Sequence, residues 1–317
     1  MSTALETRRA RLARFAWFNV LFNLFVIVWG AFVRATGSGA GCGDHWPTCN
    51  GEVIPRAPAI ETVIEFTHRL TSGGALILSV VLAVWAWRVW PKGSPVRKAA
   101  GATVFFMFVE AGVGAMLVLL QMTADNDTMA RAMVMGVHLV NTLLLVGAMV
   151  LAAWLAGGRP APSPSTDRLS ATLLGLAVLG MLVLGASGGI TALGDTLFPA
   201  GSLAEGLRQD LSPTAHLLVR LRVFHPLLAV LVAGYTVVAA FVTGPSKGPL
   251  ARRLTHAVVG FMVLQIVVGS VNVILLAPVW LQLVHLLVAD LVWISLVCLV
   301  AEVLAPASSP PNRSLAG

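Results

Sequence analysis

The sequence predicts an all-α integral membrane protein with eight transmembrane helices. The chain of 317 residues is 57% hydrophobic and only 11% charged, and its mean hydropathy is +0.86. A soluble core of this size could not bury so much apolar surface. Spanning a bilayer takes about 20 mostly apolar residues, and eight stretches meet that requirement: 16–35, 62–88, 99–121, 131–155, 170–192, 214–242, 254–276 and 280–303.

The distribution of basic residues predicts how these spans are oriented. If the N-terminus is cytoplasmic, 14 of the 21 lysines and arginines lie inside, in segments 8–14, 88–98, 159–168 and 247–253 and at residue 313. Most acidic residues then lie in the outer segments. This positive-inside pattern predicts that both termini are cytoplasmic. The net charge of +7 follows from this topology and gives no reason to expect a nucleic-acid partner.

The spans divide into two similar halves. The segment GGRPAPSPSTD predicts a cytoplasmic linker, 157–169, between an N-terminal unit, 1–156, and a C-terminal unit, 170–304, while residues 305–317 are expected to be disordered. Matching positions in the halves are Gly30 with Gly185, His68 with His225, Glu110 with Gln265, Gly114 with Gly269 and His138 with His285. Because each unit has an even number of spans, both face the same way. We therefore expect two four-helix bundles related by a pseudo-twofold axis along the membrane normal.

Histidines lie inside all the even-numbered spans, each roughly two turns from the end that this topology places outside. They are His68, His138, His225 and His285. A histidine inside a span is costly unless it faces a bundle interior and finds a partner. Four at matching depth, two in each half, favour a pair of bis-histidine heme sites, because a planar macrocycle held between two helices needs one imidazole from each side.

A metal-ion transporter is the competing use of intramembrane histidines. Ion sites normally add nearby cysteine or carboxylate ligands, and here such groups are limited to Glu65 and Asp290. The remaining histidines are expected to be structural or surface residues: His45 in an outer loop, His216 at the outer start of the sixth span and His256 at the cytoplasmic end of the seventh.

Glu65 lies three residues before His68, on the same helix face, and its counterpart in the second half is Arg222. A carboxylate beside a heme pocket is a candidate for proton handling or for stabilising a cationic intermediate. The alternative is a salt bridge to an arginine near the outer interface: Arg34, Arg69 or Arg131. Because the two halves differ here, we expect them to do different jobs.

Two cysteines share the outer loop CGDHWPTC. A disulfide between Cys42 and Cys49 is our first interpretation, since the outer compartment permits one. Two free thiols, or a metal site that includes His45, are the alternatives. A disulfide here would stiffen the loop over the first-half pocket or exchange electrons with a thiol–disulfide partner. Cys298 is predicted to be buried near the inner end of the eighth span.

The run GAFVRATGSGAGCGDHWPTC, followed by IEFTHRLTSG, resembles the first span, first outer loop and second span of bacterial heme A synthases. The repeat and the histidines extend this resemblance over nearly the whole chain. It implies an oxidoreductase of the bacterial inner membrane that converts the C8 methyl of heme O to the formyl of heme A by successive hydroxylations, for cytochrome oxidase assembly. The implied ligand pairs are His225 and His285 for heme b, and His68 and His138 for the substrate heme. Glu65 is implied in catalysis.

Some features depart from that family pattern. The second half reads His225-Pro226 where the first reads His68-Arg69, so an arginine that could pair with a heme propionate is not duplicated. A diheme b-type membrane electron carrier linked to quinol is the alternative function, and analysis of the product heme separates the two. Heme O synthase and cytochrome oxidase assembly factors are candidate partners, while the sequence does not name the electron donor.

Overall fold

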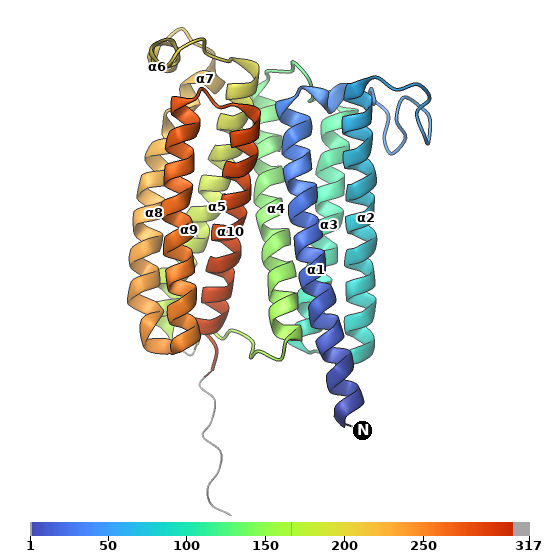
Figure 1. Cartoon of the computed structure of the whole chain (residues 1–317), viewed down its shortest axis with the longest axis vertical. Helices are drawn as coiled ribbons and strands as arrows, with labels where there is room; N and C mark the ends of the chain where they lie inside the picture. The colour runs from blue at the N-terminus through green and yellow to red at the C-terminus, as the bar shows by residue number, and fades with distance from the viewer. Residues whose placement is uncertain (1, 166, 307–317) are drawn as a thin grey trace, which may run out of the picture.

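The computed structural model describes residues 2–165 and 167–306, and this part of the chain forms a bundle of long helices (Figure 1). Most connections are short, but residues 36–59 and 198–223 form longer segments at one end of the bundle (Figure 1). Eight of the described helical segments are long and apolar enough to cross a membrane, which confirms the predicted all-α membrane fold. Most of the tail predicted to be disordered, residues 307–317, lies outside the described residues.

The helix bounds lie close to the predicted spans at most ends. The long helices are α1 (Ser2–Ala35), α2 (Ile60–Val89), α3 (Pro95–Leu119), α4 (Met129–Ala156), α5 (Arg168–Leu197), α8 (Phe224–Thr243), α9 (Pro249–Ile274) and α10 (Val279–Val303). The short elements are η1 (Ser38–Ala40), α6 (Leu203–Leu211), α7 (Leu217–Leu221) and η2 (Pro245–Lys247). The largest difference is in α1, which extends well before residue 16 because the basic segment that precedes the apolar stretch is also helical.

The sixth span is not one helix, as the sequence predicted, but is divided into α7 and α8 at Arg222 and Val223. Pro226 explains the division. A proline has no N–H to donate and its ring clashes with the carbonyl four residues earlier, which here belongs to Arg222. His225 therefore lies in the first turn of α8 rather than two turns inside a continuous helix.

Side-chain caps fix where three long helices begin. Ser94 at α3, Thr128 at α4 and Asp167 at α5 each accept a backbone N–H from the residue three positions on, as N-cap residues commonly do. Lys247 also donates a hydrogen bond to Asp167, which lowers the pKa of that carboxyl below its ordinary value. The cap of α5 is thereby tied to the turn between α8 and α9.

The long helices pack as two groups. In one, α1 contacts α2 and α4, and α3 lies between α2 and α4; in the other, α8 contacts α5 and α9, and α10 contacts α9 and α5 (Figure 1). The two groups meet where α4 packs against α5 and α10. At this boundary, the indole of Trp293 donates its N–H to the carbonyl of Leu143 at 2.7 Å and lies against Gly147. The pseudo-twofold relation and the unit boundaries 1–156 and 170–304 stay predictions.

Candidate functional site

The intramembrane histidines lie on α2, α4, α8 and α10, which all begin at the end of the molecule that carries the Cys42–Cys49 loop and α6 (Figure 1). We call this the disulfide-loop end. His68 and His138 lie on helices of the first group, and His225 and His285 lie on helices of the second. The structure therefore brings the histidines together in two pairs, one in each group of helices.

Three of the imidazoles lie against a glycine of a neighbouring helix. The contacts join Gly30 of α1 to His68, Gly188 of α5 to His225, and Gly269 of α9 to His285. A Cβ atom added at these glycines would lie only 2.8, 3.1 and 2.9 Å from the respective ring, whereas carbon atoms in good contact are about 3.5–4.0 Å apart. A Cβ atom at Gly30 or Gly269 would force the ring or the helix to shift, and one at Gly188 would crowd the ring.

The glycine that lies against His225 is not the one that the sequence matched with Gly30. The sequence paired Gly30 with Gly185, but the residue against His225 is Gly188, almost one turn further along α5. A Cβ atom at Gly185 would instead meet the side chain of Leu143, at 2.7 Å. Gly185 therefore serves the packing of α5 on α4.

Several ring nitrogens are buried without a hydrogen bond. They are the Nδ1 atoms of His68, His138 and His285, whereas Nδ1 of His225 lies 2.9 Å from the hydroxyl of Ser187. Buried polar atoms are usually paired, and either ring nitrogen of a neutral histidine can bind a metal. Glycine-backed imidazoles in pairs, with unbonded ring nitrogens, fit a bis-histidine heme site in each group of helices.

In each group, the histidine of the last long helix has a polar neighbour on the helix before it. Oε1 of Glu110 lies 3.4 Å from Nδ1 of His138, and Nε2 of Gln265 lies 3.1 Å from Nε2 of His285. These two residues were matched in the sequence analysis, but no role was predicted for them. Their positions beside the histidines make them part of the candidate sites.

Glu65 is buried and both of its oxygens are engaged. Oε2 accepts the backbone N–H of Cys42 at 2.8 Å, and Oε1 accepts Nε and Nη2 of Arg69 at 3.0 and 2.5 Å. Arg69 also donates to the carbonyls of His45 and Thr48, at 2.5 and 2.6 Å. The salt bridge to Arg69, which the sequence raised as an alternative, is therefore present. It ties α2 to the outer loop, one turn before His68.

The outer loop itself is closed by a disulfide between Cys42 and Cys49, as predicted. Both cysteines are fully buried. A Cβ atom at Gly41 would lie 2.5 Å from the backbone of Glu61, so the loop packs directly against the first turn of α2. The disulfide and the Glu65 salt bridge together fix this loop on the first histidine pair's side of the molecule.

Arg222, the counterpart of Glu65, makes a similar connection in the second group with the opposite charge. Its guanidinium contacts Asp210 at 2.8 Å and Asp195 at 3.2 Å, and donates to the carbonyl of Phe198 at 3.1 Å. These partners lie at the end of α5 and on α6. In both groups, then, a buried charged residue three positions before a histidine anchors an outer segment.

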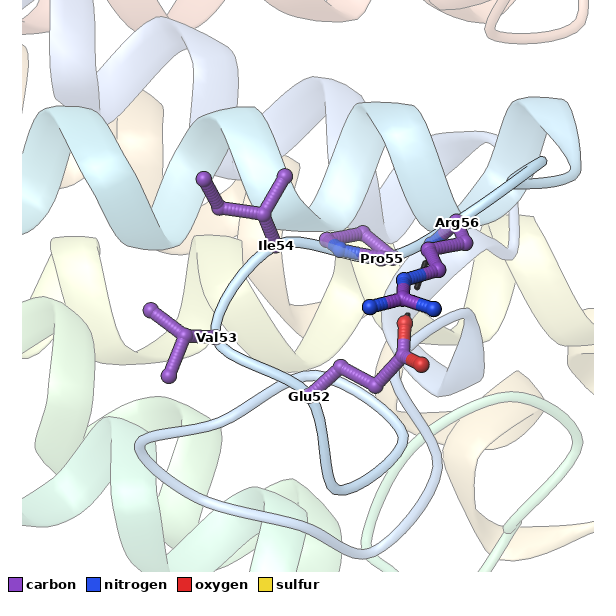
Figure 2. A pocket seen from close by; sticks show the side chains of 5 residues that line it. All are labelled: Glu52, Val53, Ile54, Pro55 and Arg56. Atoms are coloured by element: carbon purple, nitrogen blue, oxygen red, sulfur yellow. Dashed lines mark hydrogen bonds between the residues drawn. The ribbon is translucent and has the colours of Figure 1, made fainter.

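A surface pocket lies on the outer loop and is lined by Glu52, Val53, Ile54, Pro55 and Arg56 (Figure 2). The carboxylate of Glu52 accepts the backbone N–H of Arg56 at 3.0 Å, which closes this turn of the loop. No intramembrane histidine lines the pocket. We therefore do not regard it as part of the candidate heme sites.

Arg34 joins the two groups of helices at the disulfide-loop end. From the end of α1 it donates to the carbonyl of Ala192 at 2.7 Å and the hydroxyl of Thr196 at 2.6 Å, both on α5, and to Oε1 of Gln282 on α10 at 2.9 Å. The sequence considered Arg34 only as a partner for Glu65. An arginine inside a span requires partners. This requirement could have indicated that Arg34 contacts other helices.

His216, one of the histidines expected to be structural, has such a role. Its Nδ1 accepts the backbone N–H of Leu218 at 3.3 Å and so caps α7. The ring also stacks on Phe198 with 4.9 Å between centroids. His256 is exposed near the start of α9.

Comparison with known proteins identifies the family. The chain is 51% identical over 297 residues to a Thermus thermophilus protein named protoheme IX farnesyltransferase, an alignment that covers 93% of this chain and 49% of that protein. It is 32% identical over 186 residues to a heme A synthase of an Exiguobacterium species, covering 59% of this chain and 60% of the relative. The chain thus spans about half the length of the Thermus relative. Residues 13–297 match the profile of the cytochrome oxidase assembly proteins, and the chain therefore belongs to this family, COX15-CtaA.

Proposed function

We propose that the chain is a heme A synthase, an oxidoreductase that converts the C8 methyl of heme O to the formyl of heme A by successive hydroxylations. The observation that carries the proposal is the presence of two separate histidine pairs at one end of a member of this family. One pair suits a heme that stays, and the other a heme that is exchanged. The family and its heme A synthase relatives support the reaction.

In this proposal the two helix groups divide the work. His225 and His285, in the unit 170–304, would hold a resident heme b, which when bound would supply single-electron transfer. His68 and His138, in the unit 1–156, hold heme O during the reaction and release heme A. The differences between the pockets at Glu65 and Arg222 support this division, because only the first has a carboxylate next to its first histidine.

The side chains around the first pair position the substrate. Gly30 lets the ring of His68 lie directly on α1, which fixes where that ligand presents its nitrogen. Glu65 and Arg69 hold the disulfide loop at the start of the same helix. Preorganised contacts of this kind keep a reacting group in place without reorganisation during the reaction.

We propose that Glu65 also takes part in catalysis. Oxidation of a methyl to a formyl group adds oxygen from a co-substrate and passes electrons to an external oxidant, while protons are released and positive charge develops at the carbon. A carboxylate one helical turn from His68 can stabilise that charge or accept a proton. Because both oxygens of Glu65 are hydrogen-bonded, proton acceptance would require one of these contacts to open.

The proposed topology places the disulfide-loop end on the outer side of the inner membrane. The termini and the linker 157–169 then lie in the cytoplasm of a bacterial cell, since the basic segments gather at that end. The name of the Thermus relative refers to farnesyl transfer onto protoheme IX, a class of reaction that yields a prenylated heme. We propose that the substrate comes from such a transferase, so that heme O synthase is a candidate partner, beside assembly factors of cytochrome oxidase.

The test is the identity of the heme that the protein makes. The chain is expressed in cells that make heme O and lack their own heme A synthase, and the extracted hemes are identified by mass spectrometry. The proposal predicts a formyl-bearing heme with the native chain and none with His68→Ala expressed to the same level. Two bound hemes with no oxidised product would instead indicate a diheme electron carrier, and a colourless protein would indicate a transporter.

A further inference from the structure

Glu110 on α3 is held by a full set of donors on one turn of α4. Its Oε2 accepts the amide of Asn141 at 2.6 Å and its Oε1 accepts the hydroxyl of Thr142 at 2.5 Å. The same Oε1 lies 3.4 Å from Nδ1 of His138. Residues 138, 141 and 142 share a helix face because they are three and four positions apart, so a single carboxylate meets all three.

Asn141 fixes this arrangement to the backbone of α3. Besides the carboxylate, its amide nitrogen donates to the carbonyl of Phe106 at 3.0 Å, one turn before Glu110. The carboxylate therefore cannot turn away from α4 without breaking hydrogen bonds to Asn141 and Thr142. The hydrogen bonds to Asn141 and Thr142 therefore fix the position of the carboxylate beside the imidazole of His138.

The second group of helices lacks this arrangement. Gln265 replaces Glu110 and carries no charge, and the residues that match Asn141 and Thr142 are Val288 and Ala289, which have no side-chain donor. Gln265 also faces the other nitrogen of its histidine: Nε2 of His285, at 3.1 Å. The two pockets thus differ in the charge beside the ligand and in which ring nitrogen is contacted.

We propose that Glu110 is a positioning residue for the proposed reaction: it holds His138 with Nε2 directed toward the iron of the substrate heme and makes this histidine a stronger ligand than His285. The inference rests on the proposed function, since it takes His68 and His138 as the ligands of the substrate heme. A histidine that ligates a metal commonly donates its other ring N–H to a carboxylate, which fixes the ring and raises its basicity.

This difference would give the two hemes different properties in one protein. A negative charge close to a ligating imidazole favours ferric over ferrous iron and so lowers the reduction potential. A neutral amide at the matching place does not. Glu110 thereby gives the heme that is oxidised a lower reduction potential than the heme that transfers electrons.

The experiment measures reduction potentials of the full chain loaded with both hemes, by spectroelectrochemical titration and without turnover. Glu110→Gln removes the charge with little change of shape and is expected to raise the potential of one heme only. The same heme should bind about 10- to 100-fold more weakly, the usual effect of losing such a partner. Glu110→Asp keeps the charge, and its potential should lie between those of the native chain and Glu110→Gln.

Gln265→Glu is the matched variant in the second group and is expected to lower the potential of the other heme. It also tests the inference if Glu110→Gln does not fold. Unchanged potentials in both variants, or shifts of the same heme, would overturn the inference. If the native chain binds two hemes but makes no heme A, the proposed function is wrong, while the shifts in potential can still be measured. If the native chain makes heme A but the variants show unshifted potentials, only the role of Glu110 is wrong.

Discussion

Replacing Gly269 by alanine should weaken heme binding in the second group of helices. The added Cβ would lie 2.9 Å from Cε1 of His285. Since carbon atoms in good contact are at least about 3.5 Å apart, the ring or α9 must move by about 0.6 Å. Overpacking of this kind typically costs about 1–3 kcal/mol.

The expected loss of heme affinity follows from that free energy. At about 1.4 kcal/mol for each factor of ten, the Gly269→Ala chain should bind heme b about 5- to 150-fold more weakly. Gly260→Ala is the matched control, because it lies on the same helix and its added Cβ would have no atom within 4 Å. Both changes raise the helix propensity of α9 by about 1 kcal/mol, so the difference between them reports the clash.

The assay is the heme b content per protein chain after purification, with a heme titration of the depleted protein. Gly269→Ala should lose heme and its low-spin spectrum, and Gly260→Ala should keep both. Equal heme affinity in the two variants would refute the reasoning that the glycine makes room for a ligating imidazole.

Two further predictions concern the first group of helices. Cys42 and Cys49 should resist alkylation in membranes prepared without reductant and react once reductant is added, because they are bonded to each other and buried; labelling of both without reductant would contradict this. Glu65→Gln should keep the heme b of the second group but lower the rate of heme O oxidation by about 10²–10⁴, the usual loss when an acid or base is removed. Near-native heme A production by this variant would leave Glu65 with only its contacts to Arg69 and Cys42.

The membrane fold could be predicted from the sequence because apolar stretches of spanning length leave few alternatives. The break between α7 and α8 was missed although its cause, Pro226, was noticed. The apolar pattern continues across residues 214–242 and so predicts one helix, although the proline removes a backbone hydrogen bond within it. The short helix α6 was also missed. Its signal was a capping arrangement, in which Ser202 accepts the backbone N–H of Glu205 at 3.2 Å.

The histidines, the loop disulfide and a salt bridge of Glu65 could be anticipated from the sequence, but the contacts between neighbouring helices could not. Depth along a span follows from counting residues, so the pairing of His68 with His138 could be expected. Contacts between neighbouring helices depend on how each helix is rotated, which the sequence does not fix. For this reason Gly185, rather than Gly188, was matched with Gly30, and Glu110 was recognised as a match to Gln265 without its relation to His138.

In the proposed division of work, the second histidine pair retains heme b while the first exchanges heme O for heme A. The most direct measurement is the heme composition of purified His225→Ala and His68→Ala chains, both expressed with a heme O supply. We predict that His225→Ala lacks the stably bound heme b, and that His68→Ala keeps heme b with a low-spin spectrum but contains no heme A. Heme b lost from His68→Ala and retained in His225→Ala would contradict the account.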